Sequence, residues 1–237
     1  MIRPQYLQTW FSGQGLNLRP QPFAIITAHN PHGELRSWSQ NGRADEKLWI
    51  HLKESGHDPQ WVFAGSKDWS YFEESWTAHN LSVAEATDTG RAFKQDAIFW
   101  VQDGMVSVHD CESPDRVEVA PWDERCGSFW WPARSSCLYV IHLDAAVWEK
   151  KSFADANSGC NQEKPCFYVG MTALTPVERY ARHKVGHQAS ALVKNFGLGI
   201  AWEQFDHLER MSREEAERME IQLALDLRHA GHGVWQN

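Results

Sequence analysis

The segment CFYVGMTALTPVERYARH, residues 166–183, decides the fold predicted for the second half of the chain. It begins with Cys166 to Gly170, an apolar run typical of a buried strand. Thr175 is then a preferred N-cap, Pro176 suits the first helical position, and Glu178 completes a capping box. The segment therefore predicts a strand followed, after a short turn, by a helix.

The chain around this segment predicts a small α+β domain. The further elements expected are a strand over 138–143, a short helix over 190–196, a third strand over 200–208, and a helix that opens at the Ser212 capping box and ends near His229. A polar stretch over 150–165 separates the first two strands, so we expect them to form a hairpin with a long connection. The prediction is a three-stranded sheet flanked by helices.

The first half predicts a second α+β domain with a mixed arrangement of strands and helices. Strands are expected over residues 23–27, 61–64, 97–101 and 105–108, and helices over 43–54 and 83–95. Asp103-Gly104 stands between the last two strands and is a strong signal for a tight hairpin turn.

Composition and charge bound the class of protein. The 237 residues are 42% hydrophobic and 23% charged, which is ordinary for globular domains and excludes a disordered chain. The formal net charge of −8 excludes a positive field over the whole molecule. Residues 1–131 hold 11 basic and 18 acidic residues, whereas 132–237 hold 12 and 13, so the acidity belongs to the first half.

A domain boundary is expected where the pattern becomes irregular. Residues 113–134 contain three prolines and no clear periodicity, which indicates a linker or arm. We therefore predict an acidic domain over 1–112 and a second domain over 135–237.

The sequence predicts no membrane segment and no disulfide framework. No apolar run approaches the roughly 18–20 residues of a membrane span. The first residues lead into no signal-peptide core, so a cytoplasmic location is expected. The five cysteines are odd in number and form no CxxC pair, which favours reduced thiols.

Two of the expected helices carry charged residues that are candidates for a catalytic or binding role. On the helix after Thr175, Arg179 and His183 are four apart and share one side, opposite Val177 and Ala181. They should point together out of the core, either to hold a phosphate or simply to meet solvent.

Glu220 lies within the apolar stripe of the last helix. The stripe consists of Ala216, Met219, Leu223 and Leu227. A carboxylate on a packed face is costly unless it is paired, protonated or bound to a metal. The alternatives are a metal ligand or an internal ion pair with an arginine, and Glu217, at the margin of the stripe, is the reserve candidate.

Taken in order, these motifs resemble those of the GIY-YIG nucleases over roughly the last 100 residues. Tyr168-Val169-Gly170 matches the second tyrosine motif, and Tyr139 stands where the first motif has its tyrosine, after Cys137-Leu138 in place of Gly and Ile. The helix with Arg179, the later helix with Glu220 and the late Asn237 follow in the family's order.

The resemblance implies hydrolysis of a phosphodiester, with DNA favoured over RNA, using Mg²⁺ or Mn²⁺. Glu220 would be the metal ligand, and Arg179 would hold a phosphate oxygen. Tyr139 or Tyr168 would orient the attacking water and take its proton, with help from His183. The implied substrate-binding residues are Lys184, Lys194 and Asn237.

The first half resembles an uncharacterised bacterial domain family. The residues concerned are Phe23 to Pro31, Ser37, Asn41, Glu74-Ser75 and Gln95 to Ala97. Polar residues at strand ends, namely Thr27, Asn30, Asn41 and Glu74, are either binding residues or turn formers and caps. Its acidity favours a protein partner, a small cationic ligand or negative regulation of the second domain over a nucleic-acid backbone.

Two other functions compete with the nuclease hypothesis. The altered first motif and the low charge fit a catalytically inactive module that serves binding or assembly. Alternatively, the chain is a toxin-like or defence nuclease that its acidic half restrains.

Overall fold

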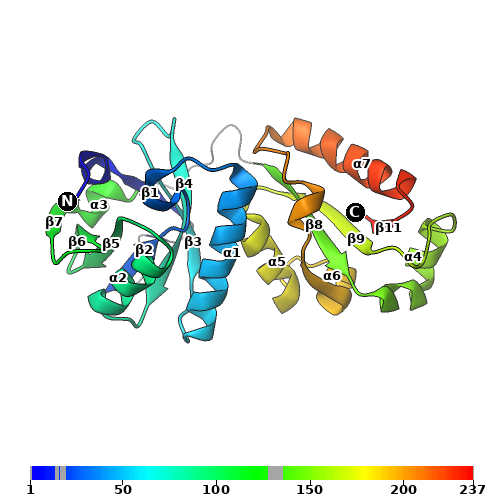
Figure 1. Cartoon of the computed structure of the whole chain (residues 1–237), viewed down its shortest axis with the longest axis horizontal. Helices are drawn as coiled ribbons and strands as arrows, with labels where there is room; N and C mark the ends of the chain where they lie inside the picture. Colours follow the sequence, from blue (N-terminus) through cyan, green and yellow to red (C-terminus); the bar gives the residue numbers. More distant parts are fainter. Residues whose placement is uncertain (1, 14–15, 17–19, 128–135, 237) are drawn as a thin grey trace. The chain divides into compact units, whose positions relative to one another are not determined.

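The computed structural model describes residues 2–13, 16, 20–127 and 136–236 (Figure 1). It divides into two compact units, Met1–Pro132 and Ala133–Asn237. Both units combine helices with a sheet, so the α+β class predicted from the sequence is confirmed.

The N-terminal unit is built on a seven-stranded antiparallel sheet with the order β1-β3-β4-β2-β5-β6-β7. The strands are β1 Trp10–Ser12, β2 Phe23–Ile26, β3 Gln60–Gly65, β4 Phe72–His79, β5 Ala97–Gln102, β6 Met105–Asp110 and β7 Arg116–Pro121. The helices are α1 Trp38–Glu54, α2 Val83–Ala92 and α3 Trp122–Arg125, with 3-10 turns η1 Pro4–Gln8 and η3 Pro31–Gly33. All the strands and helices predicted for this half are present.

The sheet is curled, and its two faces have different neighbours. A bridge between Phe11 and Cys126 links the first strand to the residue after α3, so the edges of the sheet approach each other. The inner face packs an apolar core of Phe11, Leu16, Phe23, Ile25, Val62, Ala64, Val101, Val106 and Trp122. Helix α1 contacts β4, and α2 contacts β2 and β5. Because strand side chains alternate, Glu74 and Trp76 point away from the face of Glu73 and Ser75.

Two local predictions for this half need correction. Helix α1 begins at Trp38, five residues before the predicted start, because Ser37 and Gln40 form a capping box. The predicted linker over 113–134 contains β7 and α3, and β7 pairs with β6 in the sheet. The remainder of that segment, from residue 128 on, lies outside the described residues.

The C-terminal unit has a four-stranded sheet with the order β10-β8-β9-β11. Its strands are β8 Cys137–Leu143, β9 Cys166–Thr172, β10 Gly197–Ile200 and β11 Gly233–Trp235. Its helices are α4 Lys151–Ala156, α5 Pro176–Val185, α6 Ala191–Phe196 and α7 Arg213–His229, with 3-10 turns η4 Ala145–Glu149 and η5 Trp202–Gln204. Strands β8 and β9 form the predicted hairpin with a long connection, which contains η4 and α4.

The helix starts in this unit show the N-cap half of the two predicted capping boxes. The Thr175 hydroxyl accepts a hydrogen bond from the Glu178 N–H, and the Ser212 hydroxyl accepts one from the Glu215 N–H. The predicted third strand over 200–208 is wrong beyond Ile200, because the chain turns into η5 there. The sheet also has one strand more than predicted: β11 joins β9 in parallel.

Two negative predictions can be compared with the described residues. Within them, no helix is both long and apolar enough to cross a bilayer. All five cysteines are free thiols, as their number and spacing predicted.

Candidate functional site

Five of the residues predicted to act in catalysis lie close together in the C-terminal unit. We call Tyr139, Tyr168, Arg179, His183 and Glu220 the tyrosine cluster. They come from β8, β9, α5 and α7, segments that are up to 81 positions apart, from Tyr139 to Glu220.

Strand pairing brings the two phenols onto one face. Tyr139 pairs with Gly170, and Tyr168 pairs with Ile141, so the two tyrosines are diagonal neighbours. Their ring centroids are 5.9 Å apart. Gly170 makes room for this pair, because a Cβ there would lie 2.7 Å from Tyr139 Cζ and Oη. The glycine of the Tyr-Val-Gly motif thus has a steric reason in this fold.

His183 is hydrogen-bonded to Tyr139. Its Nε2 lies 2.8 Å from the phenol oxygen, and the Ser190 backbone N–H donates to its Nδ1 at 2.9 Å. Since Nδ1 is an acceptor, the proton of the neutral ring is on Nε2 and is donated to Tyr139. Burial, reinforced by Arg179, lowers the pKa of His183 to about 4, so the ring is neutral at pH 7.

The orientation predicted for His183 is wrong. Its side chain is buried at 0% exposure instead of pointing outward with Arg179. Helix α5 contacts β8, β10 and α6, so the side of the helix opposite Val177 also meets protein.

Arg179 remains partly exposed beside the buried groups. One guanidinium nitrogen donates to the Gln188 carbonyl at 3.0 Å. Its positive charge lowers the pKa of Tyr139, Tyr168 and His183, which places it near all three.

Glu220 is only partly exposed, as its position in the apolar stripe predicted. Its pKa is raised to about 7, mainly by burial and also by Glu217, while a hydrogen bond from the Met171 backbone N–H opposes the rise. Among the described residues it forms no ion pair, so the arginine partner considered from the sequence is not found, whereas Glu217 pairs with Arg213 at 2.9 Å. Glu220 also raises the pKa of Tyr168, which places the carboxylate near that phenol.

The cluster has a covered interior and an accessible rim. Tyr139 and Tyr168 are only 1% and 2% exposed. Burial raises the pKa of both phenols; the carboxylate of Glu220 adds to this at Tyr168. Arg179 and Glu220 therefore form the part of the cluster that a ligand reaches first.

Of the three residues predicted to bind substrate, Lys184 and Lys194 are described. Lys184 donates to the carbonyls of Lys194 in α6 and Gly197 at the start of β10, at 3.3 and 3.0 Å, and so links α5 to both elements. Lys194 itself is exposed. Asn237 lies outside the described residues.

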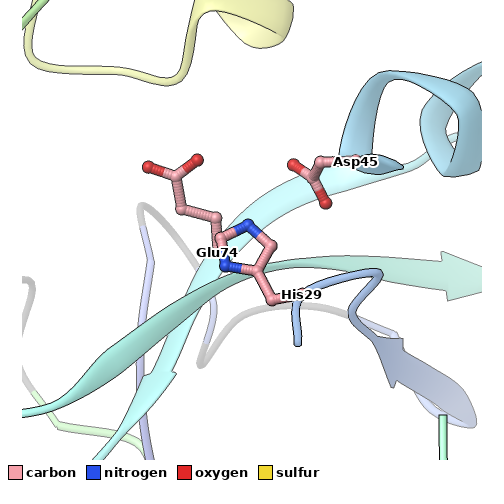
Figure 2. Close-up of side chains that lie close together, drawn as sticks. All are labelled: His29, Asp45 and Glu74. Atoms are coloured by element: carbon pink, nitrogen blue, oxygen red, sulfur yellow. The ribbon is translucent and has the colours of Figure 1, made fainter. Parts of the chain in front are cut away.

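The N-terminal unit holds a second group of ionisable side chains, shown in Figure 2. His29, Asp45 and Glu74 each offer a ligand atom, and these atoms lie within 4.8 Å of one another. The side chains come from the loop after β2, from α1 and from β4, and all three are buried. Of these, the sequence singled out Glu74 but not His29 or Asp45. Asp45 lies on the apolar face of α1 with Leu48 and Leu52, so the argument applied to Glu220 would have found it.

Polar residues singled out in the first half form a network next to this group. The Asn30 side chain accepts hydrogen bonds from the Arg36 N–H and from Asn41, and donates to Tyr71 and Glu73, at 3.0–3.1 Å. The Thr27 hydroxyl donates to the Glu74 carbonyl and accepts from the His29 N–H. These residues therefore hold the loop after β2 in place.

An open cavity of about 980 Å³ adjoins the network. Thr27, His29, Asn30, Glu73 and Ser75 are among the residues that line it. His29 thus belongs both to the cavity wall and to the buried group.

Residues 26–98 match a family model described as a protein of unknown function (DUF3293). The match lies within the N-terminal unit, agrees with the resemblance of the first half to an uncharacterised domain, and includes His29, Asp45 and Glu74. It does not extend into the C-terminal unit. No curated protein and no solved structure matches the chain.

Proposed function

We propose that the C-terminal unit hydrolyses phosphodiester bonds of nucleic acid, with DNA favoured, and that the tyrosine cluster is its site. The observation that carries this proposal is the meeting of two phenols, an imidazole, a guanidinium and a carboxylate from four separate elements. The resemblance of the motifs to GIY-YIG nucleases supports the same assignment.

The residues at the rim fit a hard divalent cation such as Mg²⁺. Glu220 is a partly buried oxygen donor without a cationic partner among the described residues, and burial together with Glu217 raises its pKa. Mg²⁺ in proteins is commonly held by one or two carboxylates, with water and substrate phosphate completing its shell. Bound at Glu220, the cation would neutralise charge on the phosphate and on the leaving oxygen.

Arg179 would bind the scissile phosphate. Its guanidinium is partly exposed, and a charge-assisted bond to a phosphate oxygen is stronger than its present bond to the Gln188 carbonyl. Releasing that carbonyl lets the guanidinium turn toward a substrate at Glu220.

The buried hydrogen bonds give the two phenols different roles. His183 donates to the Tyr139 oxygen, so the Tyr139 hydroxyl is left to donate onward, and hydrogen bonding with Tyr139 lowers the pKa of Tyr168. We therefore assign to Tyr168, rather than to Tyr139, the role of orienting and deprotonating a water molecule. Burial raises the pKa of Tyr168 above its usual value, and Arg179 opposes this rise with its positive charge. A phenol that acts as a base needs such a charge nearby, and a bound cation would add to it.

A second function, a binding module without catalysis, is favoured by the burial of the phenols. At 1% and 2% exposure, and with pKa values raised by burial, both tyrosines also serve as ordinary core residues. In this case the rim would still bind a phosphate through Arg179. For either function, the acidic N-terminal unit would regulate the C-terminal unit or bind a partner.

Cleavage assays on the full-length protein separate the two functions. Supercoiled plasmid, single-stranded DNA and RNA are incubated with Mg²⁺ or Mn²⁺, and in parallel with chelator. We expect metal-dependent cleavage that Glu220→Gln and Arg179→Gln reduce by at least about a hundredfold. The matched controls Glu217→Gln and Arg182→Gln, each on the same helix, should retain activity. Binding of DNA without cleavage would favour the second function, and cleavage that survives Glu220→Gln would overturn the first.

A further inference from the structure

The buried group in the N-terminal unit is not used by the proposed nuclease. His29, Asp45 and Glu74 come from three segments, and Figure 2 shows the imidazole between the two carboxylates in that view. Their ligand atoms lie within 4.8 Å of one another. Ligand atoms around a tetrahedral metal with bonds of about 2.0–2.1 Å stand roughly 3.4 Å apart, so small side-chain rotations suffice to close on an ion.

Asp45 is the residue whose position most needs an explanation. It is buried at 0% exposure, and neither carboxylate oxygen has a partner at hydrogen-bond geometry in the described structure. A buried carboxylate is stable only if it is paired, protonated or bound to a metal.

The composition of the group favours a metal over a further side-chain partner. Two carboxylates and a neutral imidazole carry a charge of −2 when ionised, which a divalent cation balances. Imidazole suits transition metals such as Zn²⁺, while carboxylates suit Mn²⁺ and other hard ions, so a mixed set favours a first-row transition metal.

The surroundings of the group resemble a supporting shell for ligands. Thr27 joins the backbones that hold two of the three residues, since its hydroxyl donates to the Glu74 carbonyl at 2.9 Å and accepts from the His29 N–H at 3.0 Å. The next residue, Asn30, has a left-handed backbone conformation with φ 46° and is held by Asn41. Such outer contacts fix the direction of ligating side chains.

We propose that His29, Asp45 and Glu74 bind one divalent transition-metal ion of the Mn²⁺ or Zn²⁺ class. Three protein ligands leave a coordination position for water or for a ligand atom. His29 lines the cavity of about 980 Å³, so the ion would lie behind the wall of a space that admits small polar molecules. This inference concerns the other unit and does not depend on the proposed nuclease.

The test uses full-length protein with the substitution Glu220→Gln, which removes the metal ligand proposed for the C-terminal unit. After dialysis against chelator, the protein is titrated with Mn²⁺, Co²⁺ and Zn²⁺, desalted and analysed for bound metal. We expect one ion per chain and, with Co²⁺, a visible absorption band of a protein-bound ion. Adding Asp45→Asn or Glu74→Gln should weaken binding at least about tenfold. Glu54→Gln, an exposed position at the end of α1, is the matched control and should bind like the parent.

Each of the following outcomes either supports or overturns the metal site of His29, Asp45 and Glu74. Failure of all three ions to bind the parent, or unchanged binding in both the Asp45→Asn and Glu74→Gln proteins, would overturn the proposal. Thermal unfolding in chelator shows whether each variant is folded, independently of metal binding. Because Asn is close to Asp in size and carries no charge, metal-free Asp45→Asn protein should melt no lower than its parent. If both substitutions instead lower the melting temperature in chelator, protein contacts hold the carboxylates and the metal site is wrong. Loss of nuclease activity would leave all these results unaffected.

Discussion

The phenol oxygen of Tyr139 and Nε2 of His183 are 2.8 Å apart, and this bond joins strand β8 to helix α5 across 44 positions of the chain. Both side chains are buried, so neither water nor a mobile side chain replaces the partner when one is removed. Removing either partner of this bond should therefore lower the free energy of unfolding of the C-terminal unit.

Tyr139→Phe should destabilise the protein by about 1–3 kcal/mol, because it leaves the Nε2–H of His183 buried without an acceptor. Urea denaturation at pH 7 measures the change. Tyr180→Phe, on the same helix as His183, is the comparison: the Tyr180 hydroxyl donates to the Gly197 carbonyl in a partly exposed setting, so the loss of stability should be smaller. Equal losses in the two variants would contradict the buried geometry.

His183 should make the protein sensitive to acid. Its pKa is about 4 in the folded state against about 6.5 in the unfolded chain, so the unfolded state binds a proton first as the pH falls. The stability present above pH 6.5 is then lost progressively down to about pH 4. His183→Gln should flatten this part of the stability curve, whereas His187→Gln, at an exposed position, should leave it unchanged.

Glu220 should have the opposite effect on the pH dependence. Its pKa of about 7 lies above the value of about 4.5 for a free carboxyl, so the folded state binds the proton more tightly. Its contribution to stability is complete below pH 4.5 and is lost as the pH rises through 7. In chelator, Glu220→Gln should therefore be more stable than the wild type at pH 8, relative to pH 5. Glu214→Gln, at an exposed position on the same helix, serves as the control, and identical pH profiles for both variants would refute the assignment.

Gly170→Ala tests the packing of the two phenols. The new Cβ would lie 2.7 Å from Tyr139 and 2.9 Å from Tyr168, so the rings or the strand must move. Overpacking of this kind costs about 1–3 kcal/mol, and displacement of the phenols should reduce any cleavage activity as well. Gly199→Ala on β10 meets nothing within 4 Å and should be nearly neutral in the same denaturation assay.

Asn30→Ala should cost more than Asn80→Ala, although both residues have a positive φ, of 46° and 59°. Both substitutions remove an Asn, which tolerates a positive φ better than Ala does. The difference between their losses of stability therefore measures the four side-chain hydrogen bonds of Asn30. We expect a difference of about 1–3 kcal/mol in the free energy of unfolding. A difference near zero would show that the network does not hold the loop.

Local signals made much of the fold predictable. A capping residue and a proline at the first helical position predicted the start of α5, and both are found there. The turn at Asp103-Gly104 has positive φ at both residues and joins β5 to β6, as that dipeptide favours. The inward position of Glu220 followed from helical periodicity alone.

The remaining features depend on contacts between distant segments. Helical periodicity places His183 and Arg179 on the same side of α5. It does not show that a second helix and two strands pack around α5 and bury His183. The sequence predicted a linker at β7 because prolines and charged residues surround its alternating Val117 and Val119, and no residue of this edge strand is fully buried. The grouping of His29, Asp45 and Glu74 requires the register of β4 beside β2 and the docking of α1, which no single segment encodes.

The parallel pairing of β11 with β9 has a consequence for how the protein is made. Trp235 lies opposite Tyr168, and without β11 the strand that bears Tyr168 would be an open edge of the sheet. A ribosome adds residues 233–235 only after all of α7, so during translation that edge stays available to other strands. The edge of β9 is therefore covered only after α7 has been made, and a polypeptide interrupted within α7 should be prone to aggregation.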